Sequence, residues 1–355
     1  MAAATLASGC GGASGSSSSD TPQPQQDPAA KAIEITPALA ARAPEDDRYA
    51  KPLGFAIQED ASREDDAYLA DWVTNATSVT PENALKWEVV EPGPGQFDFR
   101  RADLIVDAAQ RTSKRVRGHP LLWDQQLPAW VANRPWTADT LAEAVRNHVT
   151  TIVKRYKGRV AVWDVVNEPL EDDGSMTQSV FQRVLGDRYI DIAFQAARAA
   201  DPDAKLFMNE IGADKAGPKQ SAFIALASKV KARGAPIDGI GLQNHAVVDD
   251  FPTKDSWDQT IDAVDQAGFD FEITEMDVAL RQPGALDAAT AGAQAQAYRA
   301  AALACREHPA CTGLTVWGVT DRWSWQGPDK HPLPFDDRGE PKPAWPALRA
   351  AMLKN

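Results

Sequence analysis

The chain has 355 residues, of which 43% are hydrophobic, and it carries a formal net charge of −13. This acidic balance argues against binding to nucleic acid or to anionic membrane surfaces, because both partners carry negative charge. No run of about 18 apolar residues occurs, so the sequence predicts no membrane-spanning helix.

Residues 1–30 read as the remnant of an export signal followed by a linker. The motif Leu-Ala-Ser-Gly-Cys at residues 6–10 resembles a bacterial lipoprotein signal, which makes Cys10 a candidate site of lipid attachment. The Gly/Ser-rich and Pro/Gln-rich residues 11–28 would then form a flexible tether. We therefore expect an exported protein that is extracellular, periplasmic or lipid-anchored at the cell envelope. A disordered tail with an incidental cysteine is the alternative, since the charged start of an export signal is missing.

Eight short apolar runs after residue 50 are typical of buried strands. They are Leu53–Ile57, Ala76–Thr80, Arg115–Gly118, Val160–Val166, Lys205–Asn209, Gly239–Gln243, Phe271–Thr274 and Gly313–Trp317. Stretches with helical periodicity lie between them, at Asp103–Gln110, Ala138–Tyr156, Ser179–Ala200, Ser221–Arg233, Trp257–Ala267 and Ala288–Glu307. Because strand–helix alternation gives parallel strands with right-handed crossovers, this order predicts a single α/β domain over residues 31–355, a (β/α)8 TIM barrel.

Polar and aromatic residues follow seven of these runs, at the strand ends where such barrels place their chemistry. Glu168 follows the fourth run and Glu275 follows the seventh. Either carboxylate alone is ordinarily a solvated strand-end residue, but a pair on one sheet is the equipment for cleaving a glycosidic bond. The other strand-end residues are Glu82, Asn83, Lys86, His119, Trp123, Asn167, Asn209, Glu210, Gln243, His245, Asp277, Trp317 and Trp325.

Long ordered motifs in this part of the chain resemble glycoside hydrolase family 10, the family of endo-β-1,4-xylanases. The resemblance covers about residues 52–355 and rests on residues 78–88, 117–123, 163–169, 239–245, 273–277 and 315–321 together with Trp325. It implies that residues 31–355 form a catalytic domain that hydrolyses xylan or xylo-oligosaccharides, with no metal or other cofactor. It also implies a disulfide between Cys305 and Cys311, whose spacing alone permits either a bond or two reduced thiols.

The resemblance assigns a role to each matching residue. Glu275 resembles the nucleophile and Glu168 the acid/base of a retaining mechanism, which predicts carboxyl groups about 5–5.5 Å apart. His245 and Asp277 would hold the nucleophile ionised, and Asn167 would bind the sugar 2-hydroxyl. Hydrogen bonds to sugars or to the catalytic groups would come from Glu82, Asn83, Lys86, His119 and Gln243. Flat faces for sugar rings would come from Trp123, Trp317 and Trp325.

The sequence departs from the family at two places near the expected site. Asp124 stands where the family usually has a histidine, and Ile211 stands where it usually has an aromatic residue. Asp124 would place an anion near the cleavage site, where it could alter the protonation of the nucleophile or a contact to the sugar. Because the aromatic residue is missing at Ile211, we expect weaker or different binding of the sugar chain beyond the cleavage point. Two alternatives stay open: a related hydrolase of β-1,4-glucan or decorated xylan, and a non-catalytic carbohydrate-binding barrel.

Overall fold

The computed structural model describes residues 32–45 and 47–354. The predicted lipid-anchor motif around Cys10 and the linker after it lie outside these residues. None of the described helices combines the length and the apolar character needed to cross a bilayer.

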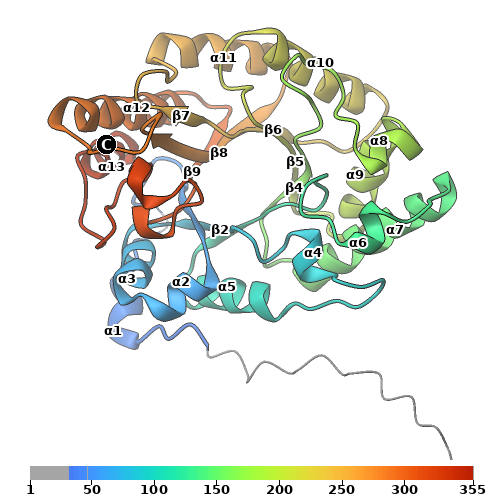
Figure 1. The fold of residues 1–355 in the computed structure, drawn as a ribbon, viewed down its shortest axis with the longest axis horizontal. Helices are drawn as coiled ribbons and strands as arrows, with labels where there is room; N and C mark the ends of the chain where they lie inside the picture. The colour runs from blue at the N-terminus through green and yellow to red at the C-terminus, as the bar shows by residue number, and fades with distance from the viewer. Residues whose placement is uncertain (1–31, 46, 355) are drawn as a thin grey trace, which may run out of the picture. The chain divides into compact units, whose positions relative to one another are not determined.

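One parallel sheet closes into a barrel (Figure 1). Its strands are β1 (Leu53–Ile57), β2 (Ser78–Pro81), β3 (Arg115–Gly118), β4 (Val162–Asn167), β5 (Lys205–Glu210), β6 (Gly239–Leu242), β7 (His245–Val247), β8 (Asp270–Ala279) and β9 (Cys311–Val316). The order is β6-β5-β4-β3-β2-β1-β9-β8-β7, and β6 also pairs with β8. That last pairing closes a ring of eight strands and confirms the predicted (β/α)8 barrel.

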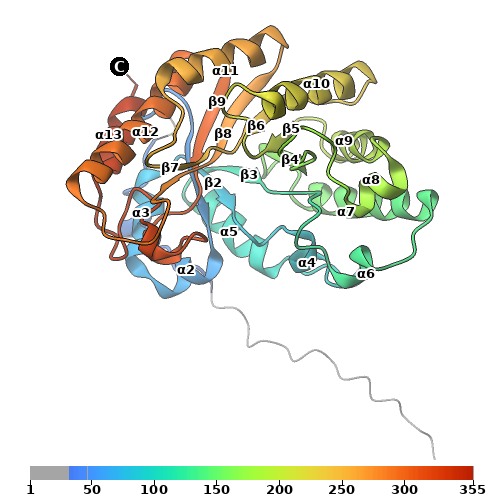
Figure 2. The ribbon, with the colours of Figure 1, turned by 45° about the horizontal axis from the view of Figure 1, so that its top comes forward.

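Helices surround the ring of strands (Figures 1 and 2). They are α1 (Pro37–Ala40), α2 (Glu59–Glu64), α3 (Asp66–Asn75), α4 (Trp87–Val90), α5 (Arg100–Arg111), α6 (Ala129–Ala132), α7 (Ala138–Arg155), α8 (Val180–Leu185), α9 (Arg188–Ala200), α10 (Pro218–Ala232), α11 (Lys254–Gln266), α12 (Ala288–Glu307) and α13 (Ala344–Met352). Two short 3-10 turns, η1 (Asp321–Trp323) and η2 (Pro328–Lys330), follow β9.

The predicted single helix over Ser179–Ala200 is wrong, because two helices, α8 and α9, occupy this stretch. Gly186 separates them with a φ of +58°, a left-handed conformation that ends α8.

A further difference from the sequence prediction lies in β8, which is longer than predicted and which, besides its pairing with β9, pairs with two other strands in turn. Its first residues pair with β6, and its last three residues pair with β7, a short strand that the sequence did not reveal. The β7–β8 pairing sets His245 directly opposite Asp277. The extension of the sheet therefore fixes a contact that matters at the site.

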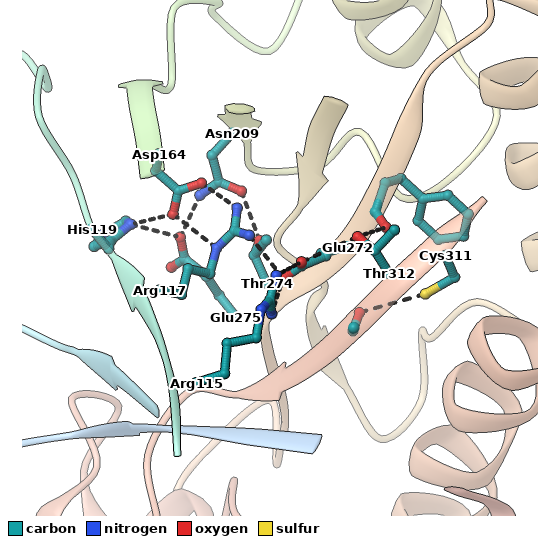
Figure 3. Close-up of polar contacts among 12 residues, drawn as sticks. Arg115, Arg117, His119, Asp164, Asn209, Glu272, Thr274, Glu275, Cys311 and Thr312 are labelled. Atoms are coloured by element: carbon teal, nitrogen blue, oxygen red, sulfur yellow. Dashed lines mark hydrogen bonds and ion pairs between the residues drawn. The ribbon is translucent and has the colours of Figure 1, made fainter. Parts of the chain in front are cut away.

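Charged side chains lie buried inside the barrel, where they form ion pairs with one another (Figure 3). The guanidinium of Arg117 is fully buried, and it contacts the carboxylate of Asp164 and lies 2.8 Å from Glu272 Oε2. Arg115 reaches Glu272 Oε1 from the other side at 2.5 Å. Burial alone would raise the pKa of Glu272, but Arg115 and Arg117 outweigh it and lower the pKa to about 2.

A disulfide joins Cys305 near the end of α12 to Cys311 at the start of β9, with a Cα–Cα distance of 5.1 Å. The bond confirms the pairing that the family resemblance implied. It closes a short loop between two consecutive elements of the barrel.

We predict that Arg117→Met lowers the free energy of unfolding by about 3–5 kcal/mol at pH 7, since it removes the buried guanidinium beside Asp164 and one of the two cations beside Glu272. Urea unfolding measures this loss. The matched control is Arg281→Met, which removes an exposed pair with Asp249 and should change stability by about 1 kcal/mol or less.

The same loss should shrink in acid. The lowered pKa of Glu272 means that its ion pairs stabilise the fold above its unfolded pKa of about 4.3. That stability is lost as the pH falls toward 2, where the folded carboxylate takes up its proton. An equal destabilisation by Arg117→Met at pH 7 and pH 3 would contradict this account.

Candidate active site

A cleft of about 590 Å³ opens at the C-terminal ends of the strands. Twelve of the predicted site residues line it: Glu82, Asn83, Lys86, His119, Trp123, Asn167, Glu168, Gln243, His245, Glu275, Trp317 and Trp325. Asp277 does not line the cleft and lies fully buried behind His245. Residues on or just after six different strands of the barrel therefore lie together in one site, as their positions at strand ends predicted.

Glu275 lies on β8, nearly buried at the floor of the cleft. The amide of Asn209 donates to its Oε1 at 2.6 Å, and His245 Nε2 lies 3.2 Å from its Oε2. The same Asn209 amide donates to Asn167 Oδ1. Asn209 Oδ1 accepts from the Thr274 hydroxyl at 2.7 Å (Figure 3). Both carboxylate oxygens are thus fixed by polar partners.

His245 links Glu275 to the buried Asp277. Its Nδ1 lies 3.0 Å from Asp277 Oδ2, opposite its contact with Glu275. Burial works to lower the pKa of His245, but the charges of Asp277 and Glu275 prevail and raise it to about 10. At neutral pH the protonated imidazole places a positive charge beside the Glu275 carboxylate.

Glu168 stands just beyond β4 in a different setting. The indole N–H of Trp123 donates to its Oε2 at 2.7 Å, and the Gln243 amide donates to its Oε1 at 2.9 Å. Its backbone has a φ of +50°, which is left-handed and uncommon for a residue with a side chain. Its N–H donates to the carbonyl of Asn209 on β5.

A charged cluster after β2 forms one wall of the cleft. Lys86 Nζ donates to Asn83 Oδ1 at 2.8 Å, and the Asn83 amide donates to Glu82 Oε1. Gln58 donates to both oxygens of Glu82, at 3.2 and 3.0 Å. Burial raises the pKa of Glu82 to about 7 and lowers that of Lys86. These groups offer donors and acceptors suited to sugar hydroxyls.

The three predicted tryptophans differ in what they expose. Trp325 is 56% exposed, and its indole N–H donates to Asp277 Oδ2 at 2.9 Å, which fixes the ring over the cleft. Trp317 is only 6% exposed and packs edge to face against His119, with 4.8 Å between the two ring centroids. Lys86 Nζ lies 5.1 Å from the ring centre of Trp123. Trp325 therefore provides the largest open aromatic surface.

Sequence reasoning missed the roles of two residues. Gln58 lines the cleft directly after β1, so the strand-end rule applied to the first run would have found it. Asn209 lies at the end of a predicted strand, but its hydrogen bonds to Glu275 and Asn167 depend on side-chain geometry that the spacing of residues does not reveal. A Cβ at Gly241 would lie 2.1 Å from Asn209 Oδ1, so a glycine there leaves room for this amide.

The two departures from the family pattern line the same hollow as Glu168. Asp124, Ile211 and Glu168 line a second hollow of about 250 Å³ that adjoins the first. Burial raises the pKa of Asp124, and the charge of Glu168 adds to the rise. Within residues 32–45 and 47–354, no group of three or more His, Cys, Asp or Glu side chains is placed to hold a metal ion.

Sequence comparison relates residues 44–351 to the family described as Glycosyl hydrolase family 10. Endo-1,4-beta-xylanase A of Phanerodontia chrysosporium is 42% identical over 263 residues, which cover 74% of this chain and 64% of that protein. The chain thus spans slightly less than two thirds of that relative. Endo-1,4-beta-xylanase 3 of Hypocrea jecorina is 40% identical over 275 residues, with 76% of this chain and 74% of that protein covered.

Solved structures agree with the sequence relatives. Xylanase 10B of Thermotoga petrophila, crystallised with xylobiose, superposes with a TM-score of 0.81 at 32% identity, covering 85% of this chain and 94% of that one. The family match over most of the chain, the identity to these relatives and the shared barrel lead to one conclusion: the chain belongs to glycosyl hydrolase family 10.

Proposed function

We propose that this protein hydrolyses internal β-1,4-xylosidic bonds of xylan by a retaining double displacement, with Glu275 as nucleophile and Glu168 as acid/base. The observation that carries the proposal is the different surroundings of two carboxylates in one cleft. Glu275 is held by a charged imidazole and an amide, whereas Glu168 is held by two neutral N–H donors. The relatives named endo-1,4-beta-xylanases support the choice of xylan.

In the first step, the Glu275 carboxylate attacks the anomeric carbon while Glu168 gives its proton to the glycosidic oxygen. The C–O bond breaks, the leaving chain departs with the proton, and an ester joins the sugar to Glu275. In the second step, ionised Glu168 takes a proton from water, whose oxygen attacks the same carbon and frees Glu275. Two inversions restore the β-configuration.

The cleft supplies what each step needs. Asn167 lies among the amides between the two carboxylates, where it can bind the 2-hydroxyl of the reacting sugar. The sugars that become attached to Glu275 can be bound by Lys86, Asn83 and Glu82. Trp325 gives a flat face on which a sugar ring can stack. We retain the expectation that the carboxyl groups lie about 5–5.5 Å apart.

We also infer that the protein is exported. The disulfide between Cys305 and Cys311 is typical of oxidising compartments, and polymeric xylan must be cut outside the cell. Lipid attachment at Cys10 stays a prediction, as does the division into a linker up to residue 30 and a catalytic domain from residue 31.

The direct test is hydrolysis of unbranched xylan beside β-glucan and carboxymethylcellulose, with the first-formed anomer followed by NMR. We expect short xylo-oligosaccharides of β-configuration, and a loss of roughly 10⁴-fold or more for Glu275→Ala. Glu64→Ala, at an exposed glutamate of α2, is the control and should behave as the parent.

Other outcomes of this assay are equally informative. Binding of xylan without cleavage would show that the protein is a non-catalytic carbohydrate-binding barrel and not an enzyme. Faster cleavage of β-glucan would change the substrate class, and α-configured first products would exclude a retaining mechanism.

The protonation of His245 gives an independent test. Because its pKa is raised to about 10, we expect no titration of this imidazole between pH 5 and pH 8 by NMR. Its ion pairs stabilise the fold fully below the unfolded pKa of about 6.5, and that stability is lost as the pH rises through about 10. A titration midpoint near 6.5 would show that the site lacks the charge proposed beside Glu275.

A further inference from the structure

The carboxyl group of Glu210, at the end of β5, touches backbone rather than open cleft. Glu210 is fully buried, and it lines neither the main cleft nor the hollow beside it. Its Oε2 accepts from the N–H of Leu170 at 3.0 Å, and its Oε1 accepts from the N–H of Ile211 at 3.0 Å. Lys219 Nζ, from the first turn of α10, lies 3.2 Å from Oε1.

Leu170 is two residues beyond Glu168, so this contact bears on the backbone of the acid/base. The N–H of Glu168 donates to the carbonyl of Asn209, the residue before Glu210. Two adjacent residues of β5 therefore hold the chain on both sides of the Glu168–Pro169 bond. Between these two points Glu168 keeps its left-handed φ of +50°, which persists only when its surroundings enforce it.

The loop after Glu168 is fastened to the same helix that carries Lys219. Leu170 pairs with Met176, and the N–H of Thr177 donates to the carbonyl of Pro169. Gly174 approaches α10 so closely that a Cβ there would lie 2.8 Å from the Ala222 side chain. Loop, helix and strand end thus form one packed unit around Glu210.

We infer that Glu210 is a positioning residue for the acid/base, an inference that rests on the proposed function. Trp123 and Gln243 fix the oxygens of Glu168, but neither fixes its backbone. Without the Glu210 contact, the Glu168–Leu170 turn can relax and carry the carboxyl away from the glycosidic oxygen. A displacement near 1 Å at a reacting group can cost about 100-fold in rate.

Leaving-group dependence separates positioning from a purely structural role. A substrate with a poor leaving group needs the proton of Glu168, whereas a 2,4-dinitrophenyl group leaves without it. Harm to the acid therefore appears in kcat/KM for phenyl β-xylobioside and not for the dinitrophenyl compound. Harm to the fold or to sugar binding lowers both values alike.

The test compares the parent with Glu210→Gln on these two substrates. Glutamine keeps one oxygen and turns an NH₂ donor toward a backbone N–H, so one of the two contacts is lost. We expect kcat/KM to fall about 10–100-fold with phenyl β-xylobioside and less than about 3-fold with the dinitrophenyl compound. Asp172→Asn, which removes the exposed second partner of Lys219, is the matched control and should match the parent on both substrates.

Equal losses on both substrates, or no loss on the phenyl substrate, would overturn the inference. If Glu210→Gln does not fold by circular dichroism, Glu210→Asp decides by the same ratio, since its shorter side chain withdraws from the Leu170 N–H. A parent that cleaves neither xylobioside nor xylan would instead refute the proposed function itself.

Discussion

The ion pairing of the buried Arg117 guanidinium is the interaction on which both the barrel and its site depend. A charge inside a barrel is tolerated only when its partners are in place, and here they are Asp164 on β4 and Glu272 on β8. Asp164 also lies 3.0 Å from His119 Nδ1, and that same nitrogen lies 3.8 Å from Glu275 Oε1 (Figure 3). The charged side chains that link the strands are therefore connected, through His119, to Glu275 at the floor of the cleft. The stability of the barrel and the placement of the Glu275 carboxylate are set by one polar array.

Irregular backbone lies at the strand ends beside the side chains that line the cleft. The register between β4 and β5 shifts after Asp164, and that between β8 and β9 shifts before Met276. Glu168 and Asn244 both adopt left-handed φ values, +50° and +62°. Bulges and strained residues of this kind recur beside active sites, where they re-aim side chains at a cost that the surrounding structure bears. The regular part of the barrel below these strand ends supplies that support.

The sequence predicted the barrel because eight apolar runs alternate with helical periodicity, and each run lies within or beside an observed strand. It gathered the cleft residues because parallel strands end at one face. It did not predict β7, because a strand of three residues is too short to show a hydrophobic pattern. It did not predict the break at Gly186, because the φ angle of a glycine cannot be inferred from the residue type alone. The contacts of Asn209 and the N–H bond of Trp123 to Glu168 stayed hidden for a different reason. They depend on side-chain rotamers, which spacing does not encode. The roles taken from the family resemblance stay predictions, although their residues lie together.

The most direct test of the retaining mechanism traps its covalent intermediate. A 2-deoxy-2-fluoro-β-xylobioside with a dinitrophenyl leaving group reacts in the first step, while the fluorine slows both steps by opposing positive charge at the anomeric carbon. The ester should therefore accumulate. We predict that intact-mass analysis shows one fluoroxylobiosyl group per chain and that peptide mapping finds it on Glu275. A label on Glu82 or Glu168 would contradict the account. So would an enzyme that cleaves xylan but is not inactivated by this reagent.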